Sequence, residues 1–166
     1  PDQVPDSATV IRPAQIGDAG EILTVQRAAF VAEAQSHDDP WLPPLTETLD
    51  AVVTAIETGA VVVLRLVDDG REGRLVGAVR RELRDHTVHI GRLVVAPDLQ
   101  GHGFGSQLLA TAEDVAGATT AELFTGHLAT ANLALYARRG YAEFGRRRAS
   151  DTVELVFLRK PLTPRT

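Results

Sequence analysis

The stretch of sequence that decides the fold is Leu93-Val94-Val95-Ala96-Pro97-Asp98-Leu99-Gln100-Gly101-His102-Gly103-Phe104-Gly105-Ser106. It begins as an apolar strand, breaks at Pro97, and passes through three glycines spaced two apart into a helical pattern. A strand, a glycine turn and a helix start are the parts of a phosphate-binding loop. Glycines let the backbone approach closely, and the first N–H groups of a helix are free to bind an anion. The stretch therefore predicts an anion site at the start of this helix.

Two familiar phosphate-binding motifs do not fit these glycines. A P-loop requires a Lys and then a Ser or Thr after its second glycine, and no Lys follows Gly105. The dinucleotide fingerprint requires G-x-G-x-x-G in a first strand–helix–strand unit, but these glycines have another spacing and lie past the middle of the chain. What remains is a phosphate-binding turn of another class, or a glycine-rich turn that only connects a strand to a helix.

The composition is that of a globular chain of 166 residues, long enough for one domain with a sizeable core. A net charge of −5 gives no general reason to expect nucleic acid or an anionic membrane as a partner. The absence of cysteine excludes disulfides, a thiol nucleophile and cysteine-ligated metals. No apolar run approaches the roughly 18 residues that would span a bilayer. The acidic start Pro1-Asp2-Gln3-Val4-Pro5 does not resemble a signal peptide. We therefore expect a cytoplasmic protein with no membrane partner.

Hydrophobic periodicity predicts strands and helices along the whole chain. Asp18 is the expected cap of the first helix. Short turns between three successive strands predict an antiparallel meander, and the strand after the next helix should run parallel to the strand before it. The predicted strands are residues 9–13, 60–67, 75–83, 87–95, 121–125, 141–144 and 152–158. The predicted helices are 18–35, 46–59, the segment from the glycine turn to Gly117, and 130–139, with a loop at 36–44.

The expected fold is a single α/β domain over residues 1–166, with loose termini at 1–8 and 161–166. Its mixed sheet is flanked by helices in the order β-α-α-β-β-β-α-β-α-β-β. The hexapeptide that begins at Gln100 and ends at Gly105 matches the pattern Gln/Arg-x-x-Gly-x-Gly. With this pattern and this element order, nearly the whole chain resembles the GNAT family of acyl-CoA-dependent N-acetyltransferases.

The resemblance implies acetyl-CoA as a co-substrate, bound without a metal. Its pyrophosphate is expected on the backbone N–H groups of the turn, and its pantetheine arm along the strand before the turn. One strand N–H would then polarise the thioester carbonyl. The implied cofactor-binding residues are Leu93, Val94, Val95, Gln100, Gly101, His102, Gly103, Phe104, Gly105 and Ser106, together with Asn132 and Tyr136.

Asn132 and Tyr136 are four residues apart and therefore share one face of the predicted helix. With Arg138, Gly140 and Tyr141 they resemble the family's motif of an Asn followed by Tyr-x-Lys/Arg-x-Gly-Phe/Tyr. The resemblance implies that Asn132 hydrogen-bonds the pantetheine arm and that Tyr136 protonates the leaving thiolate as a general acid. The alternative is that Tyr136 is a packed aromatic residue and Asn132 a residue at a helix start.

At the position where relatives most often carry their general base, this sequence has a different residue type. Relatives often use a Glu on the strand before the glycine turn, and the matching place, four residues before Leu93, is occupied by His89. Because a neutral His can act as a base near pH 7, His89 is the first candidate and His127 the second. Glu82 and Glu122 are competitors. The alternative for each histidine is a surface residue or a core residue with satisfied hydrogen bonds.

The acceptor pocket is expected between the first two helices and the loop that joins them. Candidates for its lining are Glu33, Gln35, Trp41 and Leu42, and Glu82 is a further candidate for substrate binding. Acidic side chains suit an amine, which is a cation at neutral pH. The alternative for Trp41 is a core residue that fills a helix corner.

Together with these residues, the family resemblance implies an N-acetyltransferase that moves an acetyl group from acetyl-CoA to a primary amine of a small molecule, by direct attack in a ternary complex. No covalent intermediate is expected, because the chain has no Cys and no Ser in a nucleophile elbow. One alternative is an aminoacyl-tRNA donor, which would suit the arginine cluster Arg138, Arg139, Arg146, Arg147 and Arg148. Another is a non-catalytic CoA-binding module. Dimers are common among relatives, so a homodimer also stays open.

Overall fold

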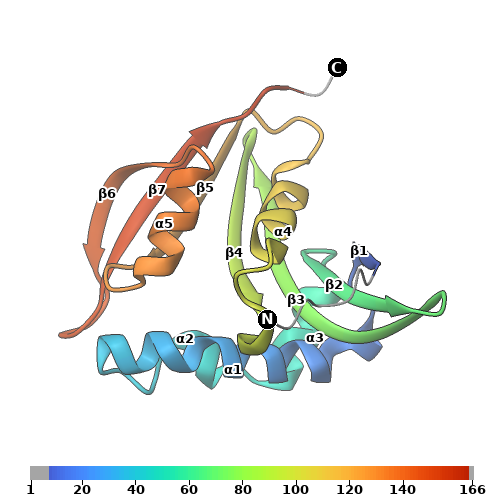
Figure 1. Ribbon diagram of the computed structural model, residues 1–166. Coiled ribbons are helices and arrows are strands. Elements are labelled where there is room, and N and C mark those ends of the chain that lie inside the picture. Colours follow the sequence, from blue (N-terminus) through green and yellow to red (C-terminus); the bar gives the residue numbers. More distant parts are fainter. Residues whose placement is uncertain (1–7, 165–166) are drawn as a thin grey trace.

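A computed structural model describes residues 8–164 as a mixed sheet flanked by helices (Figure 1). The sheet has seven strands in the order β1-β2-β3-β4-β5-β7-β6. They are β1 Thr9–Pro13, β2 Val61–Asp68, β3 Arg71–Arg84, β4 Thr87–Val95, β5 Thr120–Gly126, β6 Ala142–Arg148 and β7 Glu154–Pro161. All neighbouring strands are antiparallel except β4 and β5, which are parallel. The predicted α/β fold class, meander and parallel pair are therefore confirmed.

The helices follow the predicted order with one addition. They are α1 Ala19–His37, α2 Pro43–Thr46, α3 Leu49–Glu57, α4 Phe104–Glu113 and α5 Thr130–Arg138, with short 3-10 helices η1 Ile16–Asp18 and η2 Pro97–Leu99. The addition is α2, where prolines predicted a loop. Pro43 and Pro44 occupy the first two positions of this helix, where the missing N–H of a proline breaks no helical hydrogen bond.

Two apolar clusters fill the two faces of the sheet. Val62 of β2 packs in a cluster with Leu108 of α4, whereas the next residue, Val63, packs in a cluster with Ile22 of α1 and Val52 of α3. Successive side chains of a strand point to opposite faces, so α4 covers one face and α1 and α3 cover the other. Figure 1 shows α1 running below both the β1–β4 part and the β5–β7 part of the sheet.

The sheet opens between β4 and β5. Their parallel pairing is limited to Thr87–His89 opposite Thr120–Glu122, and the two ribbons then diverge toward α1 (Figure 1). Near this point Arg92 has a φ of 48°, in the left-handed region that residues with a side chain rarely adopt. The β3–β4 register also shifts between Ala78 and Arg80. Such an irregularity bends a strand and ends its pairing, so the last part of β4 has no strand partner on the β5 side.

Asp18 occupies the N-cap position of α1, as predicted, but its side chain makes no capping hydrogen bond to this helix. Its carboxylate instead accepts hydrogen bonds from Arg12 of β1 at 2.8 Å and from Arg65 of β2 at 2.7 Å. Asp18 is 3% exposed. The aspartate therefore ties two strands to the start of the helix, and two guanidinium groups compensate its buried charge.

Two helix boundaries also differ from the predictions. The second helix begins after Thr48, which caps it by accepting a hydrogen bond from the Ala51 N–H. The helix after the glycine turn ends at Glu113 rather than at Gly117. Val115, which the sequence placed on the apolar face of that helix, packs against the core from the following loop. The apolar pattern thus continued beyond the helical backbone.

Candidate active site

A groove of about 520 Å³ lies where β4 and β5 separate. Side chains of α1 line one side, the glycine turn and the start of α4 line another, and α5 with the loop before it lines the third. The predicted site residues that line it are Glu33, Leu93, Val94, Val95, Gln100, Gly101, Gly103, Phe104, Gly105, Ser106 and Asn132. The structure therefore brings together most of the residues predicted for the donor side and one residue predicted for the acceptor side.

The glycine turn presents the free N–H groups of a helix to this groove. Gly101 and Gly103 have φ values of 81° and 84°, which side chains disfavour. Gly103 is the residue before α4, and the first helical hydrogen bond runs from Gln107 N–H to its carbonyl. The N–H groups of Phe104 to Ser106 therefore have no partner within the helix. They are therefore free to donate hydrogen bonds to an anion at the positive end of the helix dipole.

The edge of β4 forms the adjacent wall. Val94 and Val95 pair with Ala78 and Gly77 of β3 on one side. On the β5 side, pairing has already ended at His89. The backbone groups that β3 does not use are therefore free to bond an extended ligand as a further strand would.

The end of the groove near α1 and α5 contains a partly buried carboxylate. Glu33 of α1 accepts a hydrogen bond of 2.7 Å from the Asn132 side chain of α5. The same Asn132 amide lies 3.4 Å from the Thr125 hydroxyl of β5. Burial raises the pKa of Glu33, although the hydrogen bond from Asn132 opposes this shift. Glu33 can therefore bind a cation or accept a proton within the groove.

Tyr136 lies in the apolar core rather than on the wall of the groove. It is 5% exposed, and its ring packs edge-on against Tyr141 at 5.8 Å between ring centres. Burial and, secondarily, the nearby charge of Glu33 raise the pKa of Tyr136 well above its usual value. The phenol is therefore protonated at neutral pH. A donor sulfur would have to approach its hydroxyl from the Glu33 end of the groove.

The second base candidate, His127, takes part in the scaffold beside the groove. Its Nδ1 accepts a hydrogen bond of 3.1 Å from the Glu154 N–H, and its ring meets the ring of His37 edge-on at 5.3 Å. His37 is buried and accepts a hydrogen bond from the Leu128 N–H through Nε2. Its Nδ1, 2.8 Å from the Glu33 carbonyl, is then the nitrogen that donates. The two rings join the end of α1 to the loop after β5.

Several other candidates do not line the groove. His89 lies where β4 and β5 are still paired, with its Nδ1 4.0 Å from a carboxylate oxygen of Glu122. Glu82 lines a separate hollow with Thr58 and neighbouring residues. His102, in the glycine turn, stacks on Phe104 and hydrogen-bonds backbone carbonyls of its own turn.

Gln35 and Trp41 were predicted to line the acceptor pocket, but neither residue lines the groove. Gln35 is exposed on α1, one residue from the lining residue Ser36. Trp41 is 76% exposed, so it neither lines the groove nor fills the core. Leu42 is half-buried and lies outside the lining as well. Of the acceptor-side candidates, Glu33 is the one that the structure places in the groove.

Sequence reasoning missed other lining residues. Phe30 and Ser36 of α1, Leu128 of the loop after β5, and Leu135 of α5 belong to this group. They come from segments far apart in the chain, and apolar residues at helical spacing indicate a buried face without indicating a ligand. Arg138 also lines the groove, but the other arginines of its cluster are elsewhere. Arg146, for example, pairs with Glu143 and Glu154.

Comparison with known proteins identifies the class. The model of the acetyltransferase (GNAT) family matches residues 28–141, which include β4, the glycine turn, α4 and α5. The chain belongs to this family, so the predicted class, an acyl-CoA-dependent N-acyltransferase with the GNAT fold, is confirmed. A search among curated proteins gave no significant match.

Solved structures share the fold over almost the whole chain. The PaiA N-acetyltransferase from Thermoplasma acidophilum, in complex with coenzyme A, is 15% identical, with 93% of this chain and 99% of that chain covered and a TM-score of 0.71. The ribosomal-protein-S18-alanine N-acetyltransferase from Escherichia coli is 17% identical, with 96% and 97% covered and a TM-score of 0.72. YncA from Salmonella typhimurium, solved with its cofactor acetyl-CoA, is 20% identical, with 96% and 97% covered and a TM-score of 0.70.

Two further observations concern residues 8–164. None of their helices has the length and apolar character needed to cross a membrane. Within the same residues, His, Asp and Glu side chains form no group of three or more that could hold a metal ion.

Proposed function

We propose that this protein transfers an acetyl group from acetyl-CoA to a primary amine of a small molecule, by direct attack in a ternary complex. The observation that carries the proposal is one groove in which the glycine turn, the unpaired edge of β4 and the Glu33 carboxylate meet. We also propose that residues 1–166 act as a single domain, because both apolar clusters pack on one continuous sheet.

The donor would use mainly backbone atoms of the protein. Its diphosphate would accept hydrogen bonds from the N–H groups between Gly101 and Ser106, at the start of α4. Its pantetheine arm would lie along Leu93 to Val95, and Arg138 at the wall of the groove would supply a positive charge for a phosphate. This placement brings the thioester toward the Glu33 end of the groove.

The reaction forms a C–N bond and breaks the C–S bond of the thioester. Glu33 would accept the proton that the amine must lose, because it lines the groove while His89 and His127 do not. A pKa raised by burial makes its carboxylate a stronger base. A free N–H of β4 would stabilise the oxyanion. Tyr136 does not line the groove, but its protonated phenol interacts electrostatically with Glu33, and it would return a proton to the departing sulfur.

The donor site is tested by placing a negative charge beside the expected diphosphate. Ser106 lines the groove, whereas the next residue, Gln107, is exposed and does not. Ser106→Glu should weaken acetyl-CoA binding at least about tenfold in calorimetric titrations, since the repulsion between two like charges about 4 Å apart near a protein surface exceeds about 1.4 kcal/mol. Gln107→Glu carries the same charge in the same helical turn and should bind as the wild type does.

The acceptor is tested by thiol release from acetyl-CoA with a panel of small primary amines. Release with at least one amine supports the proposal. Uptake of acetyl-CoA without release in the presence of any amine would instead indicate a non-catalytic CoA-binding module. Failure to bind coenzyme A, combined with salt-sensitive binding of tRNA, would indicate an aminoacyl-tRNA donor.

A further inference from the structure

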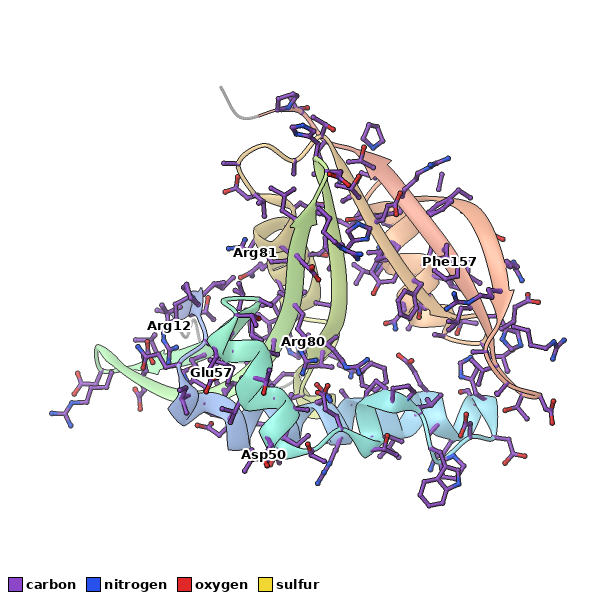
Figure 2. All side chains as sticks on the ribbon, turned by 180° about the vertical axis from the view of Figure 1, so that it is seen from behind. Arg12, Asp50, Glu57, Arg80, Arg81 and Phe157 are labelled. Atoms are coloured by element: carbon purple, nitrogen blue, oxygen red, sulfur yellow. The ribbon has the colours of Figure 1, made fainter. Side chains whose placement is uncertain are left out.

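Three charged side chains meet beside the groove, where β4 leaves β5. They are Arg80 of β3, Arg92 of β4 and Glu47, which lies between α2 and α3. Glu47 accepts hydrogen bonds from both terminal nitrogens of Arg80 and a further one, of 3.1 Å, from the Gln26 side chain of α1. Figure 2 shows Arg80 on the face of β3 that is turned toward α1 and α3. Both oxygens of Glu47 are thus already bonded.

Arg92 is incompletely paired. Its nearest carboxylate oxygen, on Glu47, lies 3.6 Å from Nη2, longer than a normal hydrogen bond. Its Nε is buried and has no hydrogen-bond partner among the described residues, and its side chain is only 25% exposed. Two guanidinium groups share one carboxylate, so the cluster has a net charge of +1 in a partly buried place. Burial lowers the pKa of Arg92, which reflects the same cost.

The backbone of Arg92 is also unusual. A φ of 48° is strained for a residue with a long side chain, and strain of this kind is commonly found at ligand sites. A glycine would adopt this conformation at lower cost. The arginine therefore costs stability twice, through its backbone and through its charge.

The cluster and the groove share one face of α1. Gln26, which touches Glu47, lies one turn before Phe30 and two turns before Glu33, and both of these line the groove. Seven helical residues span about 10 Å. The residue after Arg92, Leu93, also lines the groove. Arg92 is not itself among the residues that line the groove, so a small molecule with its amine at Glu33 would have to extend past Phe30 to reach the exposed part of the Arg92 side chain.

We propose that Arg92 binds a carboxylate of the acceptor, so that the preferred acceptor is an amino acid: one molecule with both an amine and a carboxylate. The inference rests on the proposed acetyl transfer. A carboxylate would accept hydrogen bonds from the terminal nitrogens of the guanidinium and neutralise the net charge of the cluster. Amines that carry additional positive charges would be repelled at the same place.

The test compares amino acids with the amines that remain when the carboxylate is removed. Matched pairs whose amine and carboxylate are separated by increasing lengths of chain are 4-aminobutyrate with propylamine, 6-aminohexanoate with pentylamine, and 8-aminooctanoate with heptylamine. The wild type should prefer the carboxylate-bearing member of at least one pair by about tenfold or more in kcat/KM, the range of a charge-assisted hydrogen bond. Arg92→Gln should lower kcat/KM about tenfold more for the carboxylate-bearing member than for the simple amine, and so remove this preference.

Two further variants control the result. Arg84→Gln removes an arginine that is 60% exposed at the end of β3, and should keep the wild-type preference. Arg92→Lys keeps the charge and should retain part of the preference. Because both members of a pair are assayed on one preparation, the preference does not depend on the folded fraction.

Each outcome separates the inference from the proposed function. Acetylation of both members at equal rates, or a preference that survives in Arg92→Gln, would overturn the inference and leave acetyl transfer standing. Binding of acetyl-CoA without acetylation of any amine or amino acid would overturn both.

Discussion

At the scale of single residues, Glu33 joins the two sides of the groove. Its carboxylate is held by Asn132, and burial raises its pKa. If Glu33 accepts the proton of the amine, kcat/KM should fall as the pH drops through this raised pKa, since the protonated acid cannot act as a base. Glu33→Gln should lower kcat/KM by about 100-fold and remove this acidic limb from the pH profile.

The control for Glu33 is an acid outside the groove. Glu57, at the end of α3 in Figure 2, is exposed, so Glu57→Gln should leave the rate and the profile unchanged. A Glu33→Gln variant with an unaltered acidic limb would show that another group accepts the proton.

Asp18 makes a prediction about stability. Burial alone would raise its pKa, but hydrogen bonds from Arg12, the Gln15 N–H and Arg65 outweigh burial and hold the pKa far below its usual value. A lowered pKa stabilises the folded state above the unfolded pKa of about 4, and this contribution is lost as the pH falls below it. Asp18→Asn should therefore lower the free energy of unfolding by about 3 kcal/mol at pH 7.

Urea denaturation at several pH values checks this prediction. The difference between wild type and Asp18→Asn should narrow as the pH falls below about 4. Asp98→Asn is the matched change in an exposed pair, with Arg74, and should have little effect at any pH. An Asp18→Asn difference that stays constant down to pH 2 would mean that lost packing, rather than charge, is responsible.

The sequence located the donor-side residues better than the acceptor-side residues. Gly101 and Gly103 were predictable because a turn with left-handed backbone demands glycine, and the anion site follows from the helix start alone. Trp41 and Glu82 were placed wrongly because no local pattern tells which way a loop or strand-end side chain faces. Arg92 has no signal in the sequence, since its strain and its missing partner exist only in the folded chain.

At the scale of elements, the contact between β3 and α4 depends on Gly77. A Cβ on Gly77 would lie 2.7 Å from the Leu108 side chain and 2.9 Å from the Val94 carbonyl oxygen. The first can rotate away, but the second is backbone at the wall of the groove. Gly77→Ala should cost about 1–3 kcal/mol of stability through overpacking, and should weaken acetyl-CoA binding because β4 must shift.

A glycine in the same strand supplies the comparison. A Cβ on Gly73 would meet only the Leu66 carbonyl oxygen at 3.5 Å, which is an ordinary contact. Gly73→Ala should therefore change neither denaturation by urea nor binding of acetyl-CoA by much. Equal effects of the two substitutions would contradict the assigned role of Gly77.

Element prediction succeeded where side-chain pattern and backbone agree. The β-branched run that ends at Val95 gave β4 with its observed bounds. Element prediction failed where the side-chain pattern and the backbone disagree. Val115 continues an apolar pattern after α4 has ended. Pro43 and Pro44 begin a helix, although prolines usually indicate loops. The opening between β4 and β5 has no signal in the local sequence pattern, because pairing that stops after His89 is a tertiary property.

At the scale of the whole molecule, a donor in the groove would contact both parts of the sheet. Binding to the folded state stabilises it by about 2.7 kcal/mol when the ligand is at 100 times its Kd. For a chain of this size that is a rise in Tm of roughly 5–10 °C. Calorimetric scans should show this rise for wild type and Gln107→Glu, and a smaller one for Ser106→Glu at the same acetyl-CoA concentration. No rise in the wild type would contradict donor binding.

The course of α1 has a consequence for how ligands enter. The helix packs beneath β2 through Ile22 and is bonded near its other end to Asn132 and, through His37, to Leu128. The helix α1 therefore holds the two parts of the sheet at a fixed separation. Widening the opening between β4 and β5 would require breaking these hydrogen bonds. Entry should proceed by simple diffusion into a permanent opening. In stopped-flow experiments, the observed rate of acetyl-CoA association should then rise linearly with concentration and show no plateau from a slow gating step.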